Sequence, residues 1–131
     1  MTSRTQFISG RTGRGSAYVS DLSGAEHDRF MRFSARILAP LGVVSAWLIA
    51  GLAGASFEEA RARLAHPIPA LTLIAFITLG AFHARYGTES IITDYIHDPA
   101  LKERALVVNK WALRTIPALW TLAILLIAAP S

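Results

Sequence analysis

The sequence contains no cysteine among its 131 residues. A chain without thiols cannot build a disulfide framework, a cysteine zinc site or an iron–sulfur cluster by itself. Charge is also scarce, because 17% of the residues are Asp, Glu, Lys or Arg, against roughly 25% in an average soluble domain. These two shortages exclude a disulfide-rich secreted protein and argue against an ordinary soluble domain.

Apolar residues are abundant instead, at 53% of the chain, and the mean hydropathy is +0.41. They are concentrated in three runs, and a helical membrane span needs about 20 mainly apolar residues. Three such runs leave little polar surface for a soluble exterior. The sequence therefore predicts an all-α membrane protein with three transmembrane helices and a short N-terminal amphipathic segment, as part of a heteromeric helix bundle. We expect the spans at about residues 33–55, 67–95 and 106–129.

Two polar segments lie outside these spans. The first, residues 1–24, is rich in Ser, Thr, Gly and Arg. Mitochondrial transit peptides have this composition, but we interpret the segment as a basic tail that lies on a membrane surface, followed by one anchor domain at 25–131. The second follows the first span, where Ser56 and Glu59 have the spacing of a capping box. This pattern predicts a short interfacial helix that ends before Pro67.

Basic residues are unequally distributed along the chain. Six Lys or Arg lie at or before Arg36 and five lie between Arg85 and Arg114, whereas the loop after the first span has two. With three spans, the N-terminal segment and the second loop share one side of the membrane. The positive-inside rule places that side in the cytoplasm. We therefore expect the second span to enter from the outside and to end at the inner surface.

The second span carries a histidine directly after its apolar run. Asp94 follows His83 by eleven residues, and eleven steps of about 100° return to the same helix face roughly 16 Å further along the axis. Gly87 and Ser90 fall on this face as well. One face therefore carries an imidazole, a gap without a side chain, a hydroxyl and a carboxylate, and we interpret it as a surface that faces a cofactor.

A histidine at membrane depth is costly and tends to be functional. A neutral imidazole can ligate haem iron, and Gly87 would let a flat macrocycle approach the backbone. His27, His66 and His97 all lie near the expected interfaces, so a second axial ligand would come from a partner chain. The other interpretation is a histidine that is hydrogen-bonded between helices. Spacing alone leaves both interpretations open.

Three further residues are candidates for a quinone site. Tyr95 and Asp94 either donate a hydrogen bond to a quinone and tune its surroundings, or belong to the aromatic belt and the helix end. Arg32, with Ser34 close by, either faces a quinone or a cofactor carboxylate, or extends to lipid headgroups. The residues by themselves do not decide between these alternatives.

Together these residues resemble a known family. His83, Gly87 and Asp94-Tyr95 are similar in order, spacing and depth to the second transmembrane helix of the small membrane anchor of succinate dehydrogenase (respiratory complex II), the hydrophobic subunit usually called D. The resemblance covers roughly residues 15 to 129. Short segments near the N-terminus are similar to elements of anchors from alphaproteobacteria: Gly15-Ser16-Ala17, Gly24-Ala25-Glu26-His27, Arg32-Phe33-Ser34-Ala35 and Pro40-Leu41.

The resemblance implies a membrane anchor subunit of succinate:quinone oxidoreductase, an enzyme of the tricarboxylic acid cycle and of electron transport. The chain alone would hold no complete active site. His83 would be an axial ligand of haem b, with Gly87 beside the haem, and the cytochrome b-type anchor, usually called C, would supply the other ligand. Tyr95 would hydrogen-bond ubiquinone, Asp94 would lie beside it, and Arg32 would lie in the haem and quinone region.

The implied partners, besides that second anchor, are the iron–sulfur protein and the flavoprotein of the complex and the lipid bilayer, with no nucleic acid. The implied location is the bacterial inner membrane, with a cytoplasmic N-terminus, rather than the mitochondrial inner membrane. The first span departs from the family pattern at Asp28-Arg29 and at Arg36, which leaves its contacts open. The alternatives are an anchor of quinol:fumarate reductase, a structural anchor without haem, and a small transporter or channel component.

Overall fold

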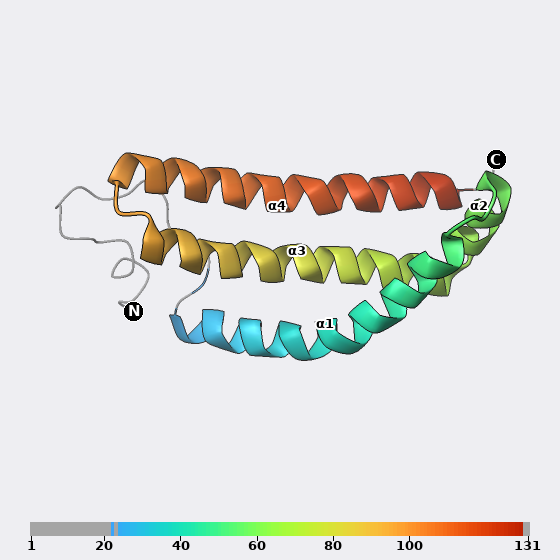
Figure 1. Ribbon diagram of the computed structural model, residues 1–131, viewed down its shortest axis with the longest axis horizontal. Helices are drawn as coiled ribbons and strands as arrows, with labels where there is room; N and C mark the ends of the chain where they lie inside the picture. The colour runs from blue at the N-terminus through green and yellow to red at the C-terminus, as the bar shows by residue number, and fades with distance from the viewer. Residues whose placement is uncertain (1–21, 23, 130–131) are drawn as a thin grey trace.

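A computed structural model describes Leu22 and residues 24–129. These residues form four helices: α1 (Gly24–Leu52), α2 (Phe57–Ala65), α3 (Pro67–Tyr95) and α4 (Pro99–Ala128). The three long helices run side by side in alternating directions, and the short α2 lies at one end of the bundle (Figure 1). The predicted all-α fold is confirmed, whereas nearly all of the basic tail at 1–24 lies outside the described residues.

The long helices contain 29, 29 and 30 residues, and all three are long and apolar enough to cross a membrane. The second has the predicted bounds, but the first and third begin before the predicted starts at residues 33 and 106. The amphipathic segment is continuous with the first span in α1. Helix α4 begins directly after Asp98, whose carboxylate accepts a hydrogen bond from the Leu101 N–H at 2.7 Å. Asp98 is therefore an N-cap, and Pro99 occupies a first-turn position that proline favours.

The short helix α2 ties together two neighbouring helix ends. Its predicted capping box is present, with the Ser56 N–H donating to Glu59 Oε2 at 2.8 Å and the Glu59 N–H donating to Ser56 Oγ at 3.3 Å. Arg61 donates to the Ala129 carbonyl at the C-cap of α4, and Arg63 donates to the Gly51 carbonyl near the end of α1. Both arginines thereby satisfy carbonyls that a helix C-terminus leaves unpaired.

The most deeply buried side chains of the bundle are polar. Arg85, Ser34 and Ser45 are all 0% exposed. The two serines lie eleven residues apart on one face of α1, and small residues on such a face allow close helix approach in lipid. A Cβ on Gly42 of the same helix would lie only 3.3 Å from the ring of Phe76. Close packing of α1 on α3 therefore depends on small residues.

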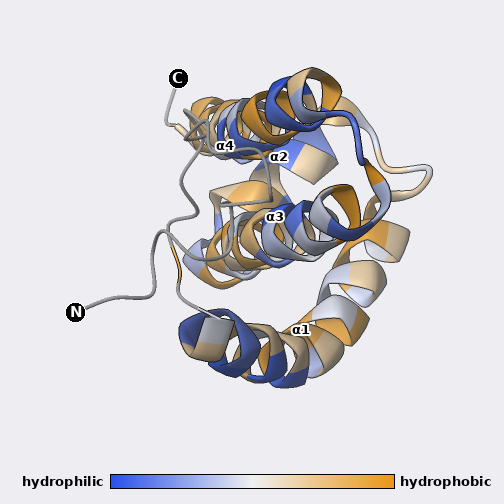
Figure 2. Cartoon of the chain, turned by 90° about the vertical axis from the view of Figure 1, so that its left-hand side faces the viewer, coloured by the Kyte–Doolittle hydropathy of each residue, from blue (hydrophilic) through white to orange (hydrophobic). Residues whose placement is uncertain are grey.

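The two ends of the bundle differ in polarity. Hydrophilic residues gather at the end where α1 and α4 begin and α3 finishes, which we call the α3–α4 end (Figure 2). Ile92 and Leu106 form a small buried apolar cluster at this end. At the opposite end, which we call the α2 end, the apolar core is larger. It consists of four buried residues: Leu64, Ala70, Leu73 and Ile124.

Candidate cofactor site on α3

The histidine of α3 is hydrogen-bonded to α1. Nδ1 of His83 lies 2.8 Å from Oγ of Ser34, and Ser34 is fully buried. The same hydroxyl lies 2.6 Å from the carbonyl oxygen of Phe30 and 3.2 Å from that of Met31. The close packing of α1 on α3 thus brings a hydroxyl from one helix and an imidazole from the other into contact.

This arrangement indicates which ring nitrogen carries the hydrogen. A carbonyl oxygen can only accept, so the single hydroxyl hydrogen of Ser34 points to the Phe30 carbonyl, its shortest contact. The hydroxyl oxygen then accepts from His83, and we assign the hydrogen of the neutral imidazole to Nδ1. Nε2 is left with its lone pair, and it makes no hydrogen bond within the described part of the chain.

The rest of this face also contacts α1. A Cβ on Gly87 would lie 3.4 Å from Cε of Met31, so the end of a flexible side chain occupies the space beside the glycine. Nε2 of His27 lies 3.0 Å from the Tyr86 carbonyl and 3.3 Å from Oγ of Ser90. Within this chain, the part of the face that carries His83, Gly87 and Ser90 therefore contacts the first half of α1.

Asp94 and Tyr95 lie apart from this contact, at the end of α3. Both are exposed, and Tyr95 is 77% exposed. Tyr95 follows His83 by twelve positions, or about 120° around the helix. Nearby, Nζ of Lys102 donates to the Thr93 carbonyl at 2.9 Å, which ties the end of α3 to the start of α4. Tyr95 and Asp94 thus form a fixed but uncovered surface at the α3–α4 end.

Arg32 is not brought to His83 within this chain. It precedes Ser34 by two residues, which is about 200° around α1, so the two side chains leave the helix in different directions. Its guanidinium pairs with Asp28 at 2.7 Å, and both side chains are largely exposed, at 74% and 64%. A role for Arg32 near a haem or quinone stays a prediction that needs a neighbouring chain.

A second polar group lies between α3 and α4. Arg85 is fully buried, its guanidinium carbon is 4.8 Å from the ring centroid of Tyr86, and Glu89 is 7% exposed. From α4, Nδ2 of Asn109 donates to the Arg85 carbonyl at 2.9 Å. The α3–α4 interface therefore carries charge at membrane depth on a face other than that of His83.

Two residues on α1 were not identified by the sequence as contacts of the α3 face. Ser34 was noted only as a neighbour of Arg32, and His27 was placed at an interface, whereas both bind α3 directly. A small hydroxyl residue inside an apolar helix is a signal for an interhelical hydrogen bond, but it does not say which helix receives the bond. Among residues 24–129, no group of three or more His, Asp or Glu could hold a metal ion by itself.

A family model described as succinate dehydrogenase/fumarate reductase transmembrane subunit matches residues 16–129. This range includes all four helices and every residue of the α1–α3 contact. No curated protein and no solved structure matches the chain.

Proposed function

The chain belongs to the family of succinate dehydrogenase/fumarate reductase transmembrane subunits, and from its geometry we propose that it contributes one axial ligand of a haem b and part of a quinone site. Membership makes the chain a multi-pass membrane anchor of a complex with iron–sulfur and flavoprotein subunits. We assign it as the D-type anchor, with the cytochrome b-type anchor, the C-type chain, as its neighbour. The two cofactor sites are assigned to different parts of α3.

The bond between His83 and Ser34 supports the haem assignment. A metal-ligating histidine commonly donates its second ring N–H to an acceptor, which fixes the tautomer and orients the ring. The buried hydroxyl of Ser34 accepts from Nδ1 in this way, and Nε2 keeps the lone pair that an iron atom needs. The donor chemistry therefore fits an axial ligand.

A haem supplies reversible one-electron chemistry, with a potential that depends on its ligands and surroundings. His83 can give only one axial ligand, so the second ligand is assigned to the partner anchor. Ser34 holds the imidazole in one orientation, and Met31 beside Gly87 is flexible enough to move aside for a planar group. Arg32 is assigned to a carboxylate or a quinone at the junction with the partner.

Tyr95 and Asp94 are assigned to the quinone. Their exposure at the α3–α4 end is what a site completed by another subunit requires. The phenol of Tyr95 can donate a hydrogen bond to a quinone carbonyl, and Asp94 can hold a proton beside it. We assign this end to the cytoplasmic side of a bacterial inner membrane, because eleven of the thirteen basic residues fall on that side. The quinone is taken to be ubiquinone, with succinate as the electron source.

The same hydrogen bond also suits a purely structural anchor. A polar contact between membrane helices stabilises their packing whether or not a cofactor is present. In that case His83 would serve only to hold α1 against α3, and an intact bundle would show no haem.

A reduced-minus-oxidised spectrum of the complex, purified with its partner subunits, separates these two functions. We expect a b-type signal in the native complex and its loss in His83→Ala, while His97→Ala, which alters an exposed histidine near the α3–α4 turn, retains it. A native complex without a b-type signal, or a His83→Ala complex that keeps it, would overturn the haem assignment. If the His83→Ala complex still assembles, the signal is lost because the haem ligand is missing and not because the chain unfolds.

A further inference from the structure

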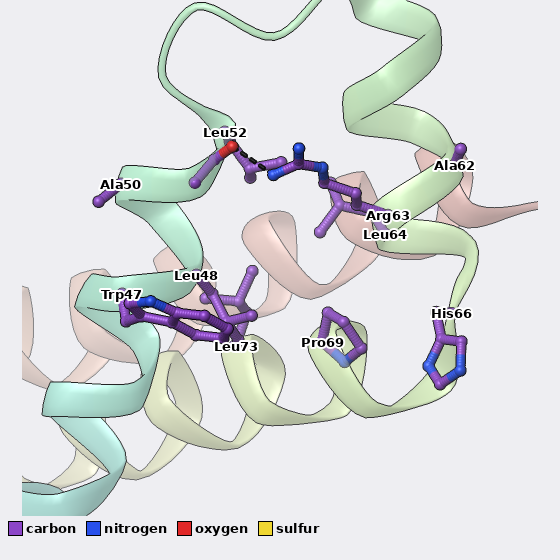
Figure 3. Close-up of a pocket in the computed structure, with 11 residues that line it drawn as sticks. Trp47, Leu48, Ala50, Leu52, Ala62, Arg63, Leu64, His66, Pro69 and Leu73 are labelled. Carbon is purple, nitrogen blue, oxygen red and sulfur yellow. Dashed lines mark hydrogen bonds between the residues drawn. The ribbon is translucent and has the colours of Figure 1, made fainter.

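A pocket of about 680 Å³ lies at the α2 end, far from the His83 face. Its lining comes from the last turns of α1, from α2 and from the start of α3 (Figure 3). The walls are mainly apolar, with Leu48 and Leu52 on α1, Leu64 on α2 and Leu73 on α3. The volume lies in the range of roughly 300–1,000 Å³ that small-molecule sites occupy. One chain therefore builds a ligand-sized apolar pocket without a partner.

The lining also contains two basic side chains, Arg63 and His66. Arg63 reaches from α2 towards the end of α1, where one Nη donates to the Gly51 carbonyl (Figure 3). A guanidinium has five N–H groups, so this bond positions the charge and leaves other donors for an anion. His66 is exposed, and its Nδ1 accepts from the Ile68 N–H at 3.4 Å, which puts the hydrogen of a neutral ring on Nε2. Arg63 thus offers N–H donors near the end of α1, and His66 offers one at the start of α3.

The nearby acidic residues lie outside the pocket, although Glu59 interacts electrostatically with Arg63. Glu58 and Glu59 belong to the first turn of α2, and neither lines the pocket. Glu59 is held by Ser56 in the capping box. The charge in the lining is therefore positive, carried by Arg63.

The pocket also lies at the depth where a membrane ends. The three spans finish or begin at the α2 end, and Trp47 in the pocket lining is 74% exposed, as is common for tryptophan at a membrane interface. A permanent cation beside apolar walls at this depth is complementary to an anionic headgroup with an apolar chain. A helix of a partner chain would need a continuous apolar groove in which to dock. Because α2 forms one wall of this pocket, the pocket suits a lipid better than a helix.

We propose that this pocket binds an anionic phospholipid, with an acyl chain against the leucines and the phosphate at Arg63. The site is distinct from the haem and quinone assignments and depends on neither. It would tie a lipid of the leaflet to α1, α2 and α3 together, at the end of the bundle where the buried core is apolar.

The test measures the lipids that stay bound to the purified complex by native mass spectrometry, after exchange into mixed phosphatidylglycerol and phosphatidylcholine. We expect phosphatidylglycerol to be retained in preference, and Arg63→Gln to reduce that retention about tenfold, the worth of one charge-assisted hydrogen bond. Arg61→Gln is the matched control, because Arg61 lies on the same helix, carries the same charge and does not line the pocket.

A second variant tests the volume without removing the charge. Ala62 lines the pocket and is exposed, so Ala62→Trp fills space while Arg63 stays in place. We expect it to reduce lipid retention as well, even if Arg63→Gln prevents assembly. Three results would each overturn the proposal. They are equal losses of lipid in the Arg61 and Arg63 variants, equal retention of the two lipids by the native complex, and unchanged retention in Ala62→Trp. Displacement of the lipid by added quinone would assign the pocket to a quinone instead.

Discussion

The two halves of this bundle hold their helices together by different contacts. Towards the α3–α4 end, the long helices are joined by side-chain hydrogen bonds, from Ser34 and His27 on α1 and from Asn109 and Lys102 on α4. Towards the α2 end, the core is leucine, isoleucine and alanine, and the hydrogen bonds between elements come from the two arginines of α2.

The difference between the two halves follows from the properties of lipid as a solvent. In lipid, burying a leucine between helices gains little over leaving it exposed, so association depends on close packing and on polar contacts. Polar contacts are directional, so they fix the rotation of α1 and α4 about α3, and this rotation sets the direction of the His83 ring. Among the described residues of the apolar half, α2 supplies hydrogen bonds to the ends of α1 and α4, and the helices leave a pocket that α2 borders.

The two buried serines of α1 allow the largest test of this comparison. Both are 0% exposed and lie on one face, but Oγ of Ser45 has no hydrogen-bond partner within the described residues. We expect Ser34→Ala to weaken haem binding roughly 10- to 100-fold, because the imidazole loses the acceptor that orients it. Ser45→Ala should leave haem binding unchanged. The measurement is a haem titration of each complex, followed through its b-type absorption.

The comparison fails if the two serine variants behave alike. Equal loss would show that any change in the small-residue face disturbs the site through packing. No loss in either would show that Ser34 does not position His83.

The second test concerns the exposed end of the polar half. Tyr95→Phe removes one hydroxyl and keeps the ring, so we expect quinone reduction to fall about five- to tenfold, the worth of one hydrogen bond. Succinate oxidation with an artificial dye acceptor should stay near its normal rate, because it does not pass through this end of α3. Both rates are measured on the same preparation, and an equal fall in both would indicate faulty assembly instead.

The third test asks whether the polar contacts of this half stabilise it. Asn109→Leu keeps a similar volume but removes the bond to the Arg85 carbonyl, and we expect a loss of about 0.6 kcal/mol, the average for such contacts in membrane proteins. SDS-unfolding curves followed by circular dichroism measure the change. Val108→Ala, at a 65% exposed neighbour, is the control and should change the curve less. A larger effect of the control would show that lipid-facing residues, and not the polar contact, set the stability.

Local signals predicted much of this fold. The capping box at Ser56 and the bounds of α3 follow from short-range patterns, and the structure has both. Helix α4 begins at Pro99, before the expected start of the third span at about residue 106, and Asp98 followed by Pro99 is a pattern of helix starts.

The site was less predictable, for a physical reason. Periodicity places His83 and Gly87 on one face, but it does not say what that face contacts. The answer depends on how α1 is rotated against α3, which is set by contacts between residues 49 positions apart, such as Ser34 and His83. The rotation of α1 also directs Arg32 away from His83 in this chain, although the resemblance placed both residues in the haem and quinone region.

The smallest expected effect is a pH dependence confined to the α2 end. The Ser56 backbone N–H, and secondarily its hydroxyl, hold the pKa of Glu59 below its usual value. A carboxyl whose pKa is lowered in the folded state contributes stability above its unfolded pKa, and this contribution is lost as the pH falls through the folded pKa. Glu59 is fully exposed, so the effect should be small. Melting temperatures compared between about pH 6 and about pH 4 should fall less in Glu59→Gln than in the native complex, because glutamine keeps the capping box without titrating.

The control is Glu58→Gln, which alters the neighbouring carboxylate outside the box. Its melting temperature should fall as that of the native complex does. An equal response of the two variants would show that the capping box is not the source of the pH dependence.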